Sequence, residues 1–198
     1  MLRGVSVFMS IKKISIVVTG EPTYIKSLIN TISYGPDELV KHSYQHPESE
    51  SMQTVQMYFG SLQVDDNHRI DFFGGNEDGL FDFVKSRPQN SFNGLILILN
   101  AEETDRVDGI KTAFIKHQNY LSKHTLVVAV SGKDYKKIKQ AEEHVRKTLS
   151  DLDWVAPVFS IDTENKEDVS LLVESLLCSA RPGINDNSHG KSLFEAGE

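Results

Sequence analysis

The segment from Gly20 to Ser27 contains residues that could bind phosphate. Gly20, followed after five residues by Lys26 and Ser27, approximates the GxxxxGK[ST] pattern, in which backbone N–H groups and a lysine hold phosphates. Ile25 occupies the position of the second glycine, where a β-branched side chain makes a positive φ costly. Pro22 removes one N–H from the segment. These residues fit a phosphate loop and an ordinary helix start about equally well, and any phosphate binding is expected to be weak.

The spacing of apolar residues predicts the elements that position this segment. Apolar, β-branched runs predict strands, and apolar residues three or four apart predict amphipathic helices between them. Such an alternation forms a three-layer α/β fold, with a mostly parallel six-stranded sheet and one antiparallel edge strand. The predicted strands are 13–19, 52–60, 61–73, 94–100, 125–131 and 155–160, and the predicted helices are 24–32, 79–85, 105–121, 135–149 and 166–179.

Two early segments interrupt this alternation. Residues 34–51 contain Gly35, Pro36 and Pro47 and have no sustained period, so we expect a long surface loop there. The Asp-Asp-Asn sequence at 65–67 predicts a hairpin turn within the second early strand segment.

A single domain accounts for most of the 198 residues. We expect an N-terminal arm over residues 1–12, the α/β domain over 13–180, and a disordered tail over 181–198, which is polar and aperiodic. The apolar runs are too short to cross a bilayer, and the first ten residues lack the features of a signal peptide. A single cysteine, Cys178, excludes an internal disulfide framework, which suits a cytoplasmic protein.

Charge and residue spacing disfavour several classes of function. The formal net charge of −7 repels phosphate backbones, so nucleic acid is not expected as a partner. None of the seven histidines has the HExxH spacing of a zinc site, and the chain lacks the GxSxG motif of serine hydrolases. We therefore expect neither a metal hydrolase nor a serine hydrolase.

Residues 13–177 resemble the Ras-like small GTPases of bacteria that are related to the polarity and gliding-motility protein MglA. This resemblance implies a P-loop NTPase fold of the small-GTPase type, with GTP or GDP and Mg²⁺ as the family's ligands. The segments that carry it are KISIVVTG, TVQMYFG, FFGG, VAVSGKD and APVFSID. Most of them are apolar strands, so they indicate architecture more strongly than activity.

The resemblance assigns nucleotide-binding roles to four residues. Lys26 would neutralise the β- and γ-phosphates, Ser27 would ligate Mg²⁺, and Gly20 would begin the phosphate loop. Asp134 matches the aspartate of the family's NKxD motif, which accepts hydrogen bonds from guanine, but it fits the N-cap of the following helix equally well. Of that motif's preceding residues, the asparagine and lysine are replaced by Ser131 and Gly132.

The switch regions of the family are altered as well. Thr54 matches the Mg²⁺-sensing switch threonine, although a β-strand threonine is the simpler interpretation. Gly74 and Gly75 match the start of the second switch, where Glu77 and Asp78 then replace a glycine and the water-positioning glutamine. Two carboxylates beside a γ-phosphate would repel it. Asp71 and Gly74 also form a DxxG, but out of register, and we interpret Asp71 as strand-end polarity.

These observations favour a degenerate small-GTPase-like protein, a pseudo-GTPase, that acts through protein–protein interaction. Guanine nucleotide with Mg²⁺ would then be bound weakly or not at all. No residue is assigned a catalytic role, and enzyme activity is not expected. The expected partner is another protein of a signalling, polarity or motility system. The alternative is a working GTP switch with slow hydrolysis, in which Lys26, Ser27 and Asp134 suffice for binding and γ-phosphate orders the loop at 34–51. A small-molecule kinase is a remote third possibility.

Overall fold

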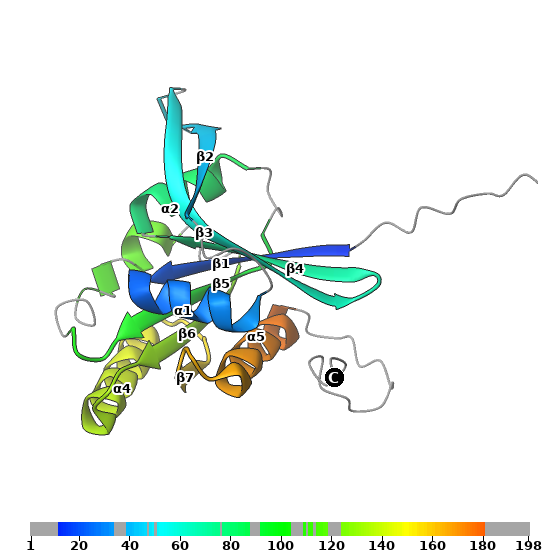
Figure 1. The fold of residues 1–198 in the computed structure, drawn as a ribbon. Helices are drawn as coiled ribbons and strands as arrows, with labels where there is room; N and C mark the ends of the chain where they lie inside the picture. Colours follow the sequence, from blue (N-terminus) through cyan, green and yellow to red (C-terminus); the bar gives the residue numbers. More distant parts are fainter. Residues whose placement is uncertain are drawn as a thin grey trace, which may run out of the picture.

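A seven-stranded mixed sheet forms the centre of the protein (Figure 1). The computed structural model describes residues 12–33, 39–46, 48–49, 51–75, 77–87, 92–103, 109, 111–112, 114–118 and 124–180. The strand order is β2-β3-β4-β1-β5-β6-β7. The strands are β1 (Lys12–Gly20), β2 (Leu39–Gln45), β3 (Met52–Asp65), β4 (His68–Gly75), β5 (Gly94–Asn100), β6 (Thr125–Ser131) and β7 (Val158–Ser160).

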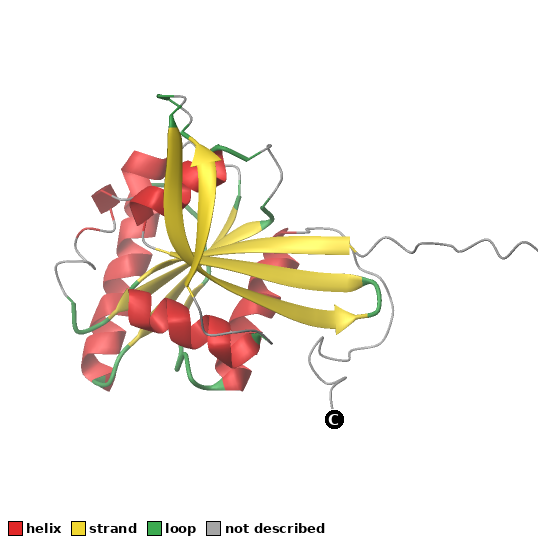
Figure 2. Ribbon diagram, turned by 45° about the horizontal axis from the view of Figure 1, so that its top comes forward, coloured by secondary structure: helices red, strands yellow, loops and turns green. Residues whose placement is uncertain are grey.

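Helices cover both faces of the sheet, as the sequence predicts (Figure 2). One core joins the sheet to α2 (Glu77–Lys85) and α4 (Tyr135–Asp151), and a second core joins it to α1 (Pro22–Ile32) and α5 (Lys166–Ala180). Described residues between 109 and 118 are helical and fall within the predicted helix 105–121. The α/β class and its three layers are therefore confirmed. None of the helices in the described ranges is long and apolar enough to span a membrane.

The sheet has one antiparallel edge, as predicted, but seven strands instead of six. β3 alone runs opposite to the other strands and lies inside the sheet, so the strand next to it at the edge pairs antiparallel with it. The edge strand is β2, which forms within the predicted loop 34–51. Buried and exposed residues alternate only over a short part of this strand. Tyr44 is buried, and the rings of His42 and Tyr44 both contact the ring of Phe83 in α2. These contacts come from a distant part of the sequence, so the local pattern did not reveal them.

The β3–β4 hairpin turns at the predicted place. The side chain of Asp65 accepts a hydrogen bond of 2.7 Å from the N–H of Asn67, which closes the turn. The two strands predicted at 52–60 and 61–73 are instead divided at this turn, because β3 continues through Gly60. A Cβ at Gly60 would lie 2.3 Å from Ser33 Oγ, so glycine lets α1 pack closely over the long strand.

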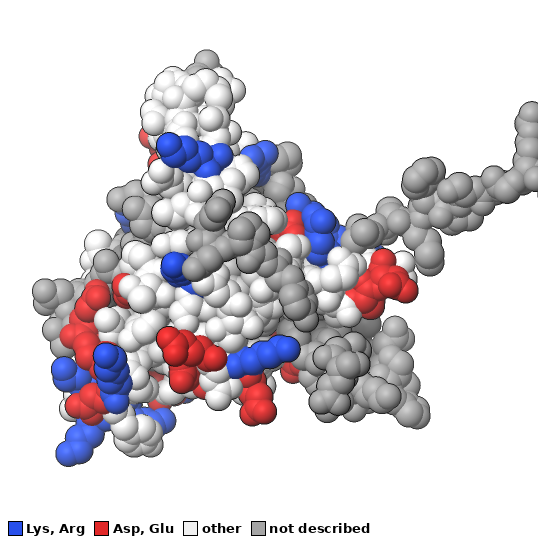
Figure 3. Space-filling model, viewed as in Figure 1, with Lys and Arg blue, Asp and Glu red and all other residues white. Residues whose placement is uncertain are grey.

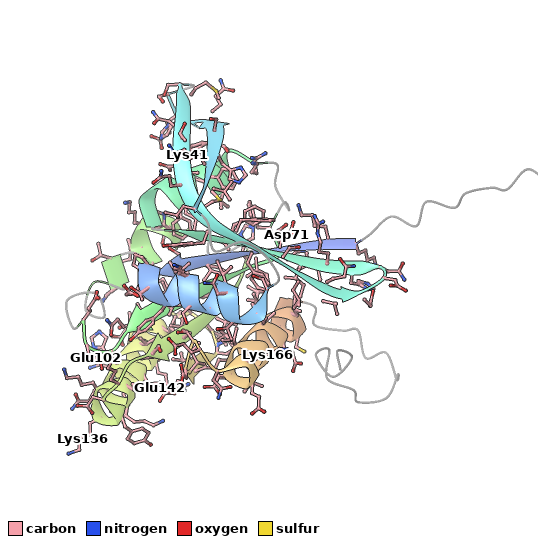
Figure 4. The ribbon with its side chains drawn as sticks, viewed as in Figure 1. Lys41, Asp71, Glu102, Lys136, Glu142 and Lys166 are labelled. Atoms are coloured by element: carbon pink, nitrogen blue, oxygen red, sulfur yellow. The ribbon has the colours of Figure 1, made fainter. Side chains whose placement is uncertain are left out.

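Asp71 lies in the middle of β4 and is fully buried, which corrects its interpretation as strand-end polarity (Figure 4). Its carboxylate accepts a hydrogen bond of 2.8 Å from Ser61 Oγ. Lys13 Nζ lies 2.6 Å from one carboxylate oxygen, and Arg69 Nε lies 3.0 Å from the other. Two cations and a hydroxyl therefore compensate the buried charge and tie β1, β3 and β4 together.

The ends of the domain are only partly described. β1 begins at Lys12, the last residue of the predicted arm. The rest of that arm and the predicted tail, 181–198, lie outside the described residues.

Candidate functional site

The carboxyl ends of the parallel strands meet at one edge of the sheet, where doubly wound folds bind their ligands. β1 ends there at Gly20, β5 at Asn100 and β6 at Ser131. The segments that follow these strands therefore form the candidate site. It contains the predicted residues Gly20 and Asp134, one from each side of β5.

Gly20 makes a sharp connection from β1 to α1. Its φ is +124°, and a Cβ built on it would lie 1.8 Å from the carbonyl oxygen of Ile98 in β5. The same oxygen accepts a hydrogen bond of 3.1 Å from the N–H of Glu21. The helix then begins directly at Pro22, whose fixed φ suits the first helical position. Only Glu21 separates the strand from the helix, so no open loop surrounds a phosphate position here.

Glu21 caps α1 with its own carboxylate. Its Oε2 accepts a hydrogen bond of 2.8 Å from the N–H of Tyr24, and its backbone is extended, as in N-cap residues. A helix N-terminus attracts anions through free N–H groups and its dipole. In this protein a side chain of the chain itself supplies that anion.

Lys26 and Ser27 lie in the second turn of α1, about 6 Å along the axis from its first residue. Ile25, at the position of the second glycine, is fully buried and faces the sheet. A Cβ at Gly74 would lie 2.5 Å from Ile25 Cγ2, so glycine at this predicted switch position gives room for the helix. The segment that would be a phosphate loop is thus the first part of a helix packed on β4.

Glu102 holds the segment after β6. Its Oε1 accepts hydrogen bonds from the N–H groups of Lys133 (2.7 Å) and Asp134 (3.1 Å). The hydrogen bond from Lys133 is the main cause that lowers the pKa of Glu102 below its ordinary value. A Cβ at Gly132 would lie 2.8 Å from Glu102 Oε2, so the glutamate side chain would have to shift to admit one.

Asp134 serves as the N-cap of α4. Its Oδ1 accepts a hydrogen bond of 2.8 Å from the N–H of Lys136. Of the two interpretations open from the sequence, the N-cap is therefore realised. Figure 4 shows Glu102 and Lys136 near the same end of α4.

Tyr24 lies under the influence of both sides of the site. Burial raises the pKa of the Tyr24 hydroxyl, and the negative charges of Glu102 and Glu21 raise it further. Ser131, at the end of β6, acts to lower the pKa of this hydroxyl. The carboxylates of Glu21, before α1, and Glu102, after β5, therefore both affect the Tyr24 hydroxyl.

The predicted switch residues lie apart from this cluster. Thr54 pairs with Ser43 across β2 and β3, with 3.5 Å between their hydroxyl oxygens. It lies four residues, about 13 Å, beyond the pairing of Tyr58 with Gly74 near the end of β4. The backbone oxygen of Gly75 accepts a 3.2 Å hydrogen bond from Thr19 Oγ1. Glu77 and Asp78 are the first two residues of α2.

Sequence reasoning missed Glu21, Tyr24 and Glu102. Glu21 carried a usable signal, because a residue directly before a proline at a helix start is in the N-cap position. Glu102 carried none, since its partners are 31 and 32 residues away. Among the described residues, no group of three His, Cys, Asp or Glu side chains could hold a metal ion.

Comparisons with known proteins support the fold. Neither models of protein families nor the curated proteins match the sequence. Solved structures do match, among them a bacterial selenocysteine-specific elongation factor, EF-Sec. That match has a TM-score of 0.56 and 19% identity, and it covers 85% of this chain but only 29% of the elongation factor. The domain therefore has a GTPase-like fold.

Proposed function

We propose that this protein is a pseudo-GTPase, a small-GTPase-like domain that works through protein–protein interaction. The observation that carries the proposal is the cap of α1. The Glu21 carboxylate accepts a hydrogen bond from the N–H of Tyr24 at the place where a GTPase fold binds phosphate. A guanine nucleotide would have to displace this carboxylate and unwind the first turn of the helix.

Electrostatics supports the same proposal. A nucleotide phosphate at this edge would face the carboxylates of Glu21 and Glu102, which already influence Tyr24 between them. Like charges placed close together repel one another, and solvent at this partly exposed site reduces that repulsion but does not remove it. Lys26 lies in the second turn of α1, away from the N–H groups with which it would cooperate. Binding of GTP or GDP with Mg²⁺ through Ser27 is therefore expected to be weak or absent.

Hydrolysis is expected to be absent or very slow for a separate reason. Glu77 and Asp78 stand in the second switch where the resembled family has glycine and glutamine. A carboxylate cannot orient an attacking water as the glutamine amide does, and it repels the γ-phosphate. If the resemblance to MglA-related GTPases extends to biology, the partner is a protein of a polarity or motility system.

The test is the nucleotide content of the purified protein. We expect extraction and chromatography to find far less than one guanine nucleotide per chain. Calorimetric titration with GDP or GTP in Mg²⁺ buffer should give no binding tighter than the millimolar range. Lys26→Ala should leave both results unchanged. An ordinary Ras-like GTPase, handled in parallel, controls for losses during extraction.

One result would replace the proposal with the working switch. Stoichiometric GDP or GTP that is lost in Lys26→Ala and turns over at the rate of an ordinary GTPase would show that Lys26, Ser27 and Asp134 suffice. The helical start of α1 would then have to open in the bound state.

A further inference from the structure

Among the residues that the structure describes, β2 pairs with another strand on one side of its backbone only. Its strand partner in the described part of the chain is β3, and it stands first in the sheet order. The N–H of His46 donates a 2.9 Å hydrogen bond to the carbonyl of Ser51, which fixes the phase of the β2–β3 ladder. Even-numbered residues of β2 therefore direct their backbone groups toward β3. The N–H and C=O groups of Leu39, Lys41 and Ser43 point to the outer edge.

The β2–β3 hairpin, here residues 39–45 and 52–58, has little charge and exposes apolar side chains. Lys41 is its one formally charged residue, in a chain of net charge −7. Leu39, Val40 and Met52 are 51%, 36% and 70% exposed, and they are three of the seven large apolar side chains exposed in the described ranges. On the face shown in Figure 3, the hairpin is mostly white, whereas red and blue side chains mix around α4.

We propose that two copies of this chain pair through their β2 strands, antiparallel about a two-fold axis, so that the sheet continues from one copy into the other. An open strand edge with exposed apolar side chains is a template for strand pairing. The proposal goes beyond the pseudo-GTPase assignment and does not depend on it, because the hairpin shares no residue with the Glu21 cap.

The edge of β2 is complementary to itself in one register. All seven residues of β2 overlap when His42 lies opposite His42 of the second copy. Lys41 then lies opposite Ser43 of the second copy, and both direct their backbone groups to the shared edge, so they exchange hydrogen bonds. Val40 lies opposite the apolar Tyr44. A shift of two residues shortens the overlap, and in one direction it places Lys41 against Lys41, which is unfavourable.

We favour a second copy over a segment of another protein, because all seven residues of β2 overlap and Lys41 lies opposite Ser43 and not opposite another lysine. Strand addition by a foreign peptide is a known mode of recognition, but it would leave the purified chain monomeric. The mass in solution therefore distinguishes the two occupants.

The first experiment compares Ser43→Pro with Ser43→Ala by size-exclusion chromatography with light scattering over a concentration series. Proline at 43 removes an outward N–H but no hydrogen bond to β3, while alanine keeps that N–H. Both substitutions remove the contact with Thr54. We expect dimers of twice 22.2 kDa for the wild type and Ser43→Ala, and a monomer for Ser43→Pro. A monomeric wild type, or a folded Ser43→Pro protein that still dimerises, overturns the proposal.

The second experiment tests the register by disulfide formation, in a Cys178→Ser background that removes the native thiol. In the proposed dimer the two positions 42 form a non-hydrogen-bonded pair about 4.5 Å apart between Cα atoms, within disulfide range. The two positions 41 are offset by two residues and lie beyond about 7 Å. His42→Cys should therefore cross-link at least tenfold more than Lys41→Cys. Equal yields, or no cross-link at 42, contradict this dimer whatever the nucleotide content.

Discussion

The conformation of the chain at the carboxyl end of β1 depends on Gly20. Its positive φ turns the chain from β1 into α1, and its missing side chain admits the carbonyl of Ile98. The N–H of Glu21 then bonds to that same carbonyl, and its carboxylate reaches the helix end. The cap of α1 therefore requires a glycine at position 20, whether or not phosphate is bound.

Gly20→Ala is expected to destabilise the fold by about 2–4 kcal/mol, because it combines a strained φ with a backbone clash. Gly75→Ala is the matched control: the nearest atom to its Cβ would lie 3.7 Å away, so the change should stay within about 1 kcal/mol. Urea unfolding of both variants measures the difference. Similar losses at the two positions would contradict the special role of Gly20.

Glu102 predicts a dependence of stability on pH. Because folding lowers the pKa of Glu102, its contribution is present above the ordinary pKa of glutamate and is lost as pH falls through the lowered value. Glu102→Gln should therefore cost up to about 1 kcal/mol at neutral pH, a value reduced by the exposure of this group to solvent.

That cost should vanish in acid, where the wild-type carboxyl is protonated. Urea midpoints from pH 7 downward provide the measurement, with Glu143→Gln on the exposed surface of α4 as the control. A cost that stays constant at all pH values would show that Glu102 acts through shape and not through charge.

Helix α1 illustrates, at the scale of the elements, what the sequence could predict. Ile25, Leu28, Ile29 and Ile32 follow helical spacing and are buried as that spacing predicts. From the sequence, Ile25 is interpreted only as a poor residue for a phosphate loop; its burial against the sheet is a finding of the structure. The contacts that complete the site could not be predicted, because Glu102 and Lys133 meet only once β5 and β6 pair.

The edge strand β2 was missed for a related reason. Its seven residues lie among prolines, and its stability comes from α2: Phe83 lies 5.6 Å from His42 and 6.1 Å from Tyr44 between ring centroids. His46 Nε2 also lies 3.5 Å from Asp82 Oδ2. Short strands held by tertiary contacts have little pattern of their own.

Phe83→Ala should destabilise the protein by about 3–5 kcal/mol, because it empties a buried site between α2 and the β2–β3 hairpin. Amide hydrogen exchange should rise more in β2 than in the central strand β5. Leu171→Ala on α5, where the side chain is 55% exposed, should change stability by no more than about 0.5 kcal/mol. Uniform exchange across both strands would mean that α2 does not hold the hairpin in particular.

At the scale of the whole molecule, the charge of −7 opposes association while the hairpin favours it. Salt screens repulsion between the two copies but does not weaken backbone hydrogen bonds between strands. Raising salt from about 0.01 M to about 1 M shortens the Debye length from about 30 Å to about 3 Å. The dimer should therefore become several-fold tighter, as measured by sedimentation equilibrium. A dimer that weakens with salt would be held by ion pairs, which the β2 edge does not offer.

The carboxylate of Glu21 has a consequence for how such a protein could convey information. A group attached to the chain is always present at high local concentration and cannot be removed by an exchange factor or consumed by hydrolysis. Such a protein would therefore have no active state whose lifetime is set by nucleotide hydrolysis. A cell could then regulate the output without nucleotide exchange, for example by how much of the protein it synthesises, where it keeps it, and how fast it degrades it.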